Sequence, residues 1–286
     1  MFIQYKSEEI DQINVFYREA GNRENPTILL LHGFPSSSHM FRNLIPKLMD
    51  EFHIIAPDYP GFGNSDQPDM ANFEYNFDNL ALTIDKFVKK IKLKTFSIYV
   101  HDYGAPIGFR LAVKHPERIQ AMITQNGNAY EEGLMSAWDP IRTYWENPSE
   151  ENKNSLRHLL KVDFTEYQYR DGTRKPEAIS PDAWNMDQFV LDRPGNDEIQ
   201  LALYYDYQNN VKQYPEWQDY FRTHQPPTLV AWGKNDMFFG PKGALAFQND
   251  LKDCDVHLLN TGHFPLEEEL ETSAHLIKQF LKDRLA

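Results

Sequence analysis

An acidic residue, Asp102, stands at the junction of a predicted strand and a predicted helix, in the segment VHDYGA (100–105). A sharp strand-to-helix turn lifts its tip residue out of a sheet and is known as a nucleophile elbow. Gly104 provides the small residue that such a turn needs, whereas Val100 is bulkier than the usual glycine. A carboxylate that attacks saturated carbon forms an alkyl ester, which water then opens at the carbonyl. Asp102 therefore predicts a substrate with a leaving group on saturated carbon, an epoxide or an alkyl halide; the alternative is an ordinary helix N-cap.

The segment HGFP (32–35) directly follows an apolar run and is a second candidate part of the site. A glycine and an X-Pro bond let the backbone turn so that an N–H points inward. We expect the backbone N–H groups of Phe34 and Tyr103 to form an oxyanion hole. Taken alone, the same four residues are also compatible with an unremarkable turn, which is the less favoured alternative.

Two further segments carry the remaining polar residues of a hydrolytic site. His263, in TGHF (261–264), follows the last predicted strand, where a histidine can act as a general base near neutral pH. Asp236, in WGKND (232–236), follows the preceding strand and would accept the imidazole N–H, which fixes the tautomer. The sequence has neither a Cys/His metal pattern nor a glycine-rich phosphate loop, so we expect no metal and no cofactor.

The motifs are separated by alternating strands and amphipathic helices. Strands are predicted at 13–19, 27–31, 54–56, 96–100, 119–124, 228–231 and 256–259, and helices at 37–49, 77–91, 103–115, 242–251 and 270–281. This alternation predicts an α/β fold, with a mostly parallel sheet covered by helices on both faces. Residues 128–223 have no clear buried strand and predict a helical cap, inserted into a core formed by 1–127 and 224–286.

The composition argues against several functional classes. The 286 residues include 29 Lys and Arg against 42 Asp and Glu, and the net charge of −13 disfavours nucleic acids and anionic membranes as partners. No run of 18 apolar residues and no signal pattern is present, and the single Cys254 suits a reducing compartment, so a cytoplasmic protein is expected. Aromatic residues reach 14%, which suits a cavity for a small apolar substrate. These features are compatible with a monomer or a homodimer.

An ordered set of motifs resembles the α/β-hydrolase family over nearly the whole chain. The set comprises the HG turn, the loop DYPGFGNS (58–65), the elbow, the insertion, the acid and the histidine. With Asp at the elbow, the chain resembles the branch of epoxide hydrolases and haloalkane dehalogenases. The resemblance implies that Asp102 is the nucleophile, Asp236 the acid and His263 the base. It also implies that the cap is inserted after the sixth strand of the fold.

The choice between the two activities depends on the residues near the leaving group. HGFP matches the HGXP motif of epoxide hydrolases, whereas dehalogenases commonly carry a halide-binding Asn in place of Phe34 and Trp in place of Tyr103. The stretch SSSHMFRN (36–43), in contrast, resembles that of dehalogenases. Asn126 stands where some dehalogenases carry their acid, which leaves Asp236 for that role.

Epoxide hydrolases also use two cap tyrosines to protonate the epoxide oxygen. The segment LYYDY (203–207) lies where the second one belongs; Tyr205 fits best, with Tyr204 beside it. Tyr144 is the only tyrosine in the region of the first one, although another alignment places Ile141 there.

We therefore expect a hydrolase that acts on a small apolar substrate and water, first by epoxide opening and second by dehalogenation. A hypothesis of another class is a non-catalytic relative that binds a small apolar ligand.

Overall fold

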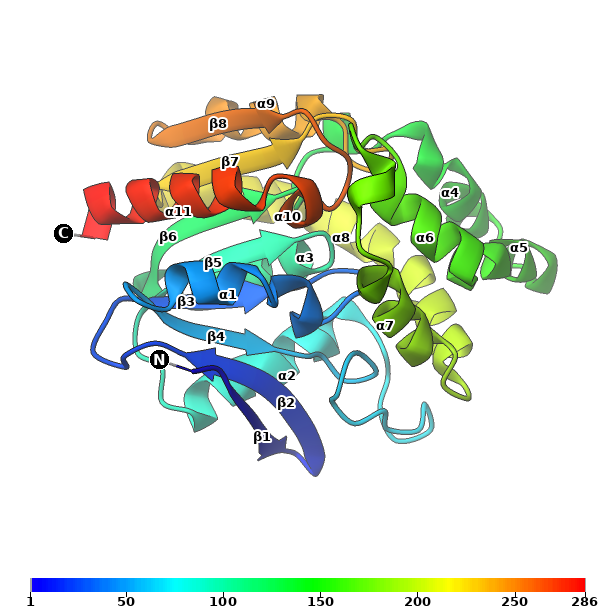
Figure 1. Cartoon of the computed structure of the whole chain (residues 1–286). Coiled ribbons are helices and arrows are strands. Elements are labelled where there is room, and N and C mark those ends of the chain that lie inside the picture. The colour runs from blue at the N-terminus through cyan, green and yellow to red at the C-terminus, as the bar shows by residue number, and fades with distance from the viewer. Residues whose placement is uncertain (1, 286) are drawn as a thin grey trace.

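The computed structural model describes residues 2–285, which fold around one eight-stranded sheet (Figure 1). The strands lie in the order β1-β2-β4-β3-β5-β6-β7-β8. Their bounds are β1 Gln4–Ile10, β2 Ile13–Ala20, β3 Thr27–Leu31, β4 His53–Pro57, β5 Phe96–His101, β6 Ile119–Gln125, β7 Thr228–Gly233 and β8 Cys254–Leu259. The β1–β2 and β2–β4 pairs are antiparallel and the other pairs are parallel, so the predicted mostly parallel sheet is confirmed.

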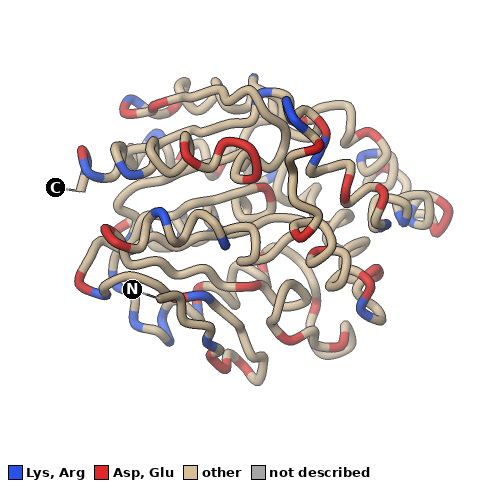
Figure 2. The backbone as a smooth tube through the Cα atoms, in the orientation of Figure 1, with Lys and Arg blue, Asp and Glu red and all other residues tan. Residues whose placement is uncertain are grey.

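Helices cover both faces of this sheet, as predicted. One face carries α2 (Phe77–Lys90), α3 (Gly104–Lys114) and α9 (Pro241–Asp250), and the other carries α1 (Leu44–Leu48) and α11 (Leu270–Leu285) (Figure 1). The central strands, β3 to β7, contain no Asp, Glu, Lys or Arg and are drawn without charge in Figure 2. Strands that are buried on both sides require this continuous lack of charge.

Between β6 and β7 the chain forms a group of helices that lies beyond the carboxyl ends of the parallel strands (Figure 1, green to yellow). The α-helices are α4 Asp139–Glu146, α5 Glu150–Ser155, α6 Val162–Arg170, α7 Pro181–Leu191 and α8 Asn196–His224. Short 3-10 helices connect them: η3 Glu131–Gly133, η4 Ser136–Trp138, η5 Leu156–Leu160 and η6 Pro176–Ala178. We call this segment the cap. Within residues 2–285, no helix has both the length and the apolar character needed to cross a membrane.

Three elements differ from those that the sequence predicts. β1 (QYKSEEI) is charged and largely exposed, and it pairs only with β2 at the sheet edge, so it has no hydrophobic pattern to reveal it. The helix predicted at 37–49 is divided into η1 (Ser38–Phe41) and α1. α8 is a single helix of 29 residues, where irregular helices are predicted. Its sequence does not reveal it, because the helix buries polar residues such as Gln200 and Asn210 and therefore has no clear apolar stripe.

Candidate active site

Asp102 lies on the tight turn between β5 and α3, at the carboxyl end of the sheet. Its φ of 46° places a non-glycine residue in the left-handed region, a strained backbone that is characteristic of nucleophile turns. Gly104 is required here, because a Cβ at this residue would lie 2.2 Å from the carbonyl oxygen of Leu31. The alternative of a helix cap is not supported, since the N-cap position of α3 is Tyr103. The turn therefore presents a buried carboxylate, 5% exposed, at the place where the elbow motif predicts it.

Two glycines make room for Val100, which occupies the elbow position that is usually glycine. A Cβ on Gly108 would lie 2.5 Å from Val100 Cγ1, and one on Gly127 would lie 3.1 Å from Val100 Cγ2. The volume that Val100 adds is thus removed from the positions that face it. This departure from the motif is compensated locally and leaves the turn intact.

The Phe34 backbone N–H donates a hydrogen bond of 2.7 Å to Asp102 Oδ2. Burial is the largest influence on Asp102 and raises the pKa of its carboxyl to about 6. His263 and the backbone N–H groups of Phe34 and Tyr103 act in the opposite direction, because they favour the charged form. The two N–H groups that the sequence predicts for an oxyanion hole are therefore both directed at this carboxylate.

His263 Nδ1 lies 2.8 Å from Asp236 Oδ2, although 27 residues separate them. Burial alone would lower the pKa of His263, but the charge and hydrogen bond of Asp236, together with the charge of Asp102, raise it above its usual value. Asp236 Oδ1 is fixed in turn by the Phe238 N–H at 2.7 Å. The structure thus brings Asp102, His263 and Asp236 together at the carboxyl ends of β5, β8 and β7.

Asn126 joins these groups, a role that the sequence does not predict. Its Nδ2 donates to Asp236 Oδ2 at 2.7 Å, and its Oδ1 accepts from the Gly233 N–H at 2.9 Å. The Asn126 carbonyl also accepts the Asp102 N–H at 3.3 Å, with Asn126 at a φ of 52°. Asn126 therefore connects the end of β6 to the Asp236 carboxylate through its side chain and to the Asp102 backbone through its carbonyl. The resemblance to dehalogenases identifies position 126 only as the place where some of them carry the acid of the triad.

A cavity of about 30 Å³ lies between the core and the cap at Asp102. The core lines it with Asp102, His263, Phe34, Tyr103 and Phe238. The cap lines it with Trp138, Ile141, Leu159, Phe164, Gln168 and Tyr204. Most of these side chains are apolar, which suits the predicted apolar substrate. The cavity is small, which favours a small substrate.

The cap tyrosines occupy different positions from those that we expect from the sequence. Tyr204 lines the cavity and its ring lies 5.4 Å from that of Phe34. Tyr205 and Tyr144 are not among the lining residues; they contact each other at 5.1 Å between ring centroids. Consecutive residues on a helix point about 100° apart, so Tyr204 and Tyr205 cannot both face Asp102. Of the three tyrosines predicted to contact the leaving group, the structure therefore places only Tyr204 at this cavity, where Ile141 also lines the wall.

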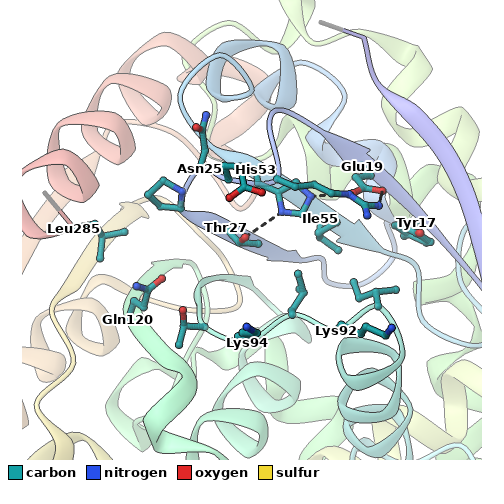
Figure 3. Close-up of a pocket in the computed structure, with 16 residues that line it drawn as sticks. Tyr17, Glu19, Asn25, Thr27, His53, Ile55, Lys92, Lys94, Gln120 and Leu285 are labelled. Carbon is teal, nitrogen blue, oxygen red and sulfur yellow. Dashed lines mark hydrogen bonds and ion pairs between the residues drawn. The ribbon is translucent and has the colours of Figure 1, made fainter.

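A cleft of about 630 Å³ lies at the opposite edge of the sheet, where the parallel strands begin (Figure 3). Its central group is Glu19, whose carboxylate accepts hydrogen bonds from Lys6 and Arg23 and contacts His53 Nε2 at 2.9 Å. His53 Nδ1 contacts the Thr27 hydroxyl at 3.0 Å, so Glu19, His53 and Thr27 form one connected polar group (Figure 3). This cleft contains none of the residues of the candidate site. Among residues 2–285, no three His, Cys, Asp or Glu side chains are grouped as metal ligands would be.

Comparison with known proteins agrees with this fold. A family model described as the alpha/beta hydrolase fold matches residues 26–270. A Saccharomyces cerevisiae protein described as an uncharacterized hydrolase is 45% identical over 277 residues, which are 96% of this chain and 95% of that protein. Epoxide hydrolase 2 of Caenorhabditis elegans is 23% identical, covering 98% of this chain and 80% of that protein. A haloalkane dehalogenase of Bradyrhizobium diazoefficiens is 36% identical over 106 residues, covering only 37% of this chain and 33% of that protein. These matches favour an enzyme over a non-catalytic binding protein, and the chain belongs to the α/β-hydrolase family as one of its hydrolases.

Proposed function

We propose that the protein hydrolyses small epoxides to diols through an alkyl ester on Asp102. The observation that carries the proposal is that a carboxylate and a tyrosine line one cavity. Asp102 comes from the core with one oxygen bound by the Phe34 N–H, and Tyr204 comes from the cap. The carboxylate can attack a saturated carbon, and the tyrosine can protonate the oxygen that leaves it.

In the first step, Asp102 Oδ1 attacks an epoxide carbon and the carbon–oxygen bond breaks. The oxygen takes the proton of the Tyr204 hydroxyl, which leaves a tyrosinate and a hydroxyalkyl ester. Burial raises the pKa of Tyr204, so its hydroxyl keeps the proton until the alkoxide develops. Asp102 Oδ2, which the Phe34 N–H holds, becomes the carbonyl oxygen of the ester.

In the second step, His263 takes a proton from water, and the water oxygen attacks the ester carbonyl. The negative charge develops on Oδ2, where the Phe34 and Tyr103 N–H groups stabilise it. When the carbon–oxygen bond to the substrate breaks, the departing alkoxide takes the proton from His263. The proton left on the Asp102 carboxyl returns through solvent to the tyrosinate, which restores the enzyme.

Dehalogenation is the second candidate, and a specific observation favours it. The Tyr103 hydroxyl is buried without a hydrogen-bond partner among the described residues, and its ring lines the cavity. It follows the nucleophile, where the resemblance places a halide-binding Trp. Phe34 argues against a halide, because its side chain cannot donate a hydrogen bond where dehalogenases commonly use Asn.

The test of the proposed function uses His263→Gln, mixed with 1,2-epoxypentane and analysed by intact-protein mass spectrometry. We expect the mass of one epoxide to be added at Asp102, because the base is needed only for the second step. The wild type should convert the same compound to its diol. No adduct on the variant, with the wild type active, would exclude Asp102 as the nucleophile; turnover of 1-bromobutane alone would establish dehalogenation.

A further inference from the structure

Gln168 on α6 has a buried amide that the mechanism above does not use. The residue is 2% exposed, and its Nε2 has no hydrogen-bond partner among residues 2–285. A buried N–H donor without a partner costs stability, and native proteins seldom retain one without a reason. Gln168 lines the cavity that contains Asp102 and His263, so a bound molecule could satisfy this donor.

The position of Gln168 follows from the two faces that α6 presents. Phe164 and Gln168 are one turn apart and both line the cavity. The next residues, Thr165 and Tyr169, face α7 instead: Thr165 donates to Gln188 at 2.8 Å, and Tyr169 donates to Asp187 at 2.5 Å. These bonds fix the rotation of α6 and hold Gln168 toward the cavity.

Gln188 shows how a buried glutamine is normally satisfied in this cap. It is 7% exposed, and its Nε2 donates to the Leu160 carbonyl at 3.2 Å and to Asp192 at 2.7 Å. Its Oε1 accepts from Thr165. Gln188 is therefore a structural residue and a matched control for Gln168.

We propose that Gln168 binds an acceptor oxygen of the substrate, so that the preferred epoxides carry an ether, carbonyl or hydroxyl oxygen close to the ring. This inference rests on the proposed function and narrows its substrate class. Leu159, Phe164 and Phe238 line the same cavity and carry no hydrogen-bond donor, so the amide offers a polar contact among apolar side chains. The attacking water is a poorer occupant, because an N–H donated to its oxygen would withdraw the electron density that attacks the ester.

The test compares two epoxides of nearly the same shape, glycidyl methyl ether and 1,2-epoxypentane, in which one oxygen replaces one CH₂ group. We measure the ratio of their kcat/KM values for the wild type and for Gln168→Met, which has similar length and no amide. We expect this ratio to fall roughly ten- to a hundredfold in the variant, the scale of losing one buried hydrogen bond. Dividing one enzyme's ratio by the other's removes the intrinsic reactivity of the two compounds.

Gln188→Met is the control and should lower the melting temperature without changing the ratio. If Gln168→Met does not fold, Gln168→Asn replaces it in the test. The asparagine side chain is one CH₂ group shorter, so its amide no longer reaches the substrate oxygen and the ratio should fall in this variant too. An unchanged ratio in the Gln168 variants would overturn the inference. Equally slow turnover of both epoxides, with the alkyl ester accumulating on Asp102, would also overturn the inference. It would indicate that Gln168 binds the attacking water instead of the substrate.

Failure of the proposed function is recognised separately. An enzyme that ignores both epoxides and turns over bromoalkanes is a dehalogenase. The ratio of the kcat/KM values for 2-bromoethyl methyl ether and 1-bromobutane then tests, in the same way, whether Gln168 binds a substrate oxygen.

Discussion

Tyr204 and Tyr205 are adjacent in the sequence, but only Tyr204 lines the cavity that contains Asp102. We expect Tyr204→Phe to slow epoxide opening by roughly ten- to a thousandfold, the scale of losing one general acid. Tyr205→Phe should remain within about twofold of the wild type, because Tyr205 packs against Tyr144 instead. Rapid-mixing measurements of ester formation in the two variants provide the comparison.

The same pair distinguishes the leaving groups, because a halide departs as a stable anion and needs no proton. Any activity on 1-bromobutane should therefore survive in Tyr204→Phe. Loss of epoxide activity in Tyr205→Phe, with Tyr204→Phe unaffected, would reverse the assignment of the proton donor.

The two steps should depend differently on pH. Asp102 must be ionised to attack, and burial raises the pKa of its carboxyl to about 6, so ester formation should decline as the pH falls through this value. His263 must be neutral to accept a proton from water. The charge of Asp102 helps to raise the pKa of His263, and this charge is absent from the ester. Ester hydrolysis should therefore persist to lower pH than titration of His263 in the free enzyme indicates.

Single-turnover rates of formation and decay of the ester, measured from pH 4 to pH 9, separate these two titrations. Ester formation that stays constant down to pH 4 would contradict the raised pKa of Asp102.

At the level of elements, the packing of β5 against α3 depends on the pair Val100 and Gly108. Gly108→Ala should destabilise the protein by about 1–3 kcal/mol, because the new Cβ would lie 2.5 Å from Val100 Cγ1. The cost should be much smaller in a Val100→Ala background, where that contact is removed. Urea unfolding of the wild type, the two single variants and the double variant measures this coupling. Additive effects would mean that Val100 and Gly108 do not share the same space.

The elements that the sequence predicts well are those that position Asp102 and His263. β3 and β5 are fully buried, mainly apolar runs followed by motif residues, so both their existence and their ends can be read from the sequence. β8, which precedes His263, is mostly not buried and has the weaker pattern CDVHLL. The cap is less readable, because α8 buries polar residues and carries Pro215 within the helix. The sequence does not reveal which face of α8 is directed at the cavity, so it cannot decide whether Tyr204 or Tyr205 lies there. Gln168 has no sequence signal either, because an unsatisfied amide is visible only when its neighbours are known.

At the scale of the whole molecule, the two edges of the sheet differ in how they treat a buried carboxylate. At the carboxyl edge, burial raises the pKa of Asp102 to about 6. At the amino edge, burial also acts to raise the pKa of Glu19, but hydrogen bonds from Arg23, Lys6 and His53 outweigh it and lower this pKa to about 2 (Figure 3). The reactive carboxylate therefore destabilises the fold when it ionises, whereas Glu19 stabilises it.

This contrast predicts opposite effects of neutralising each group. Ionised Asp102 costs stability above about pH 6, and this cost disappears as the pH falls toward 3.8, so Asp102→Asn should gain roughly 1–3 kcal/mol at pH 7.5 and almost nothing at pH 4. Glu19 stabilises the fold above pH 4.5, and this contribution is lost only as the pH falls toward 2. Glu19→Gln should therefore lose roughly 1–3 kcal/mol at pH 7.5 and still most of that at pH 4. Urea unfolding at the two pH values gives all four differences. An Asp102→Asn protein less stable than the wild type at pH 7.5 would show that Asp102 supports the fold, and that the enzyme does not trade stability for a reactive carboxylate.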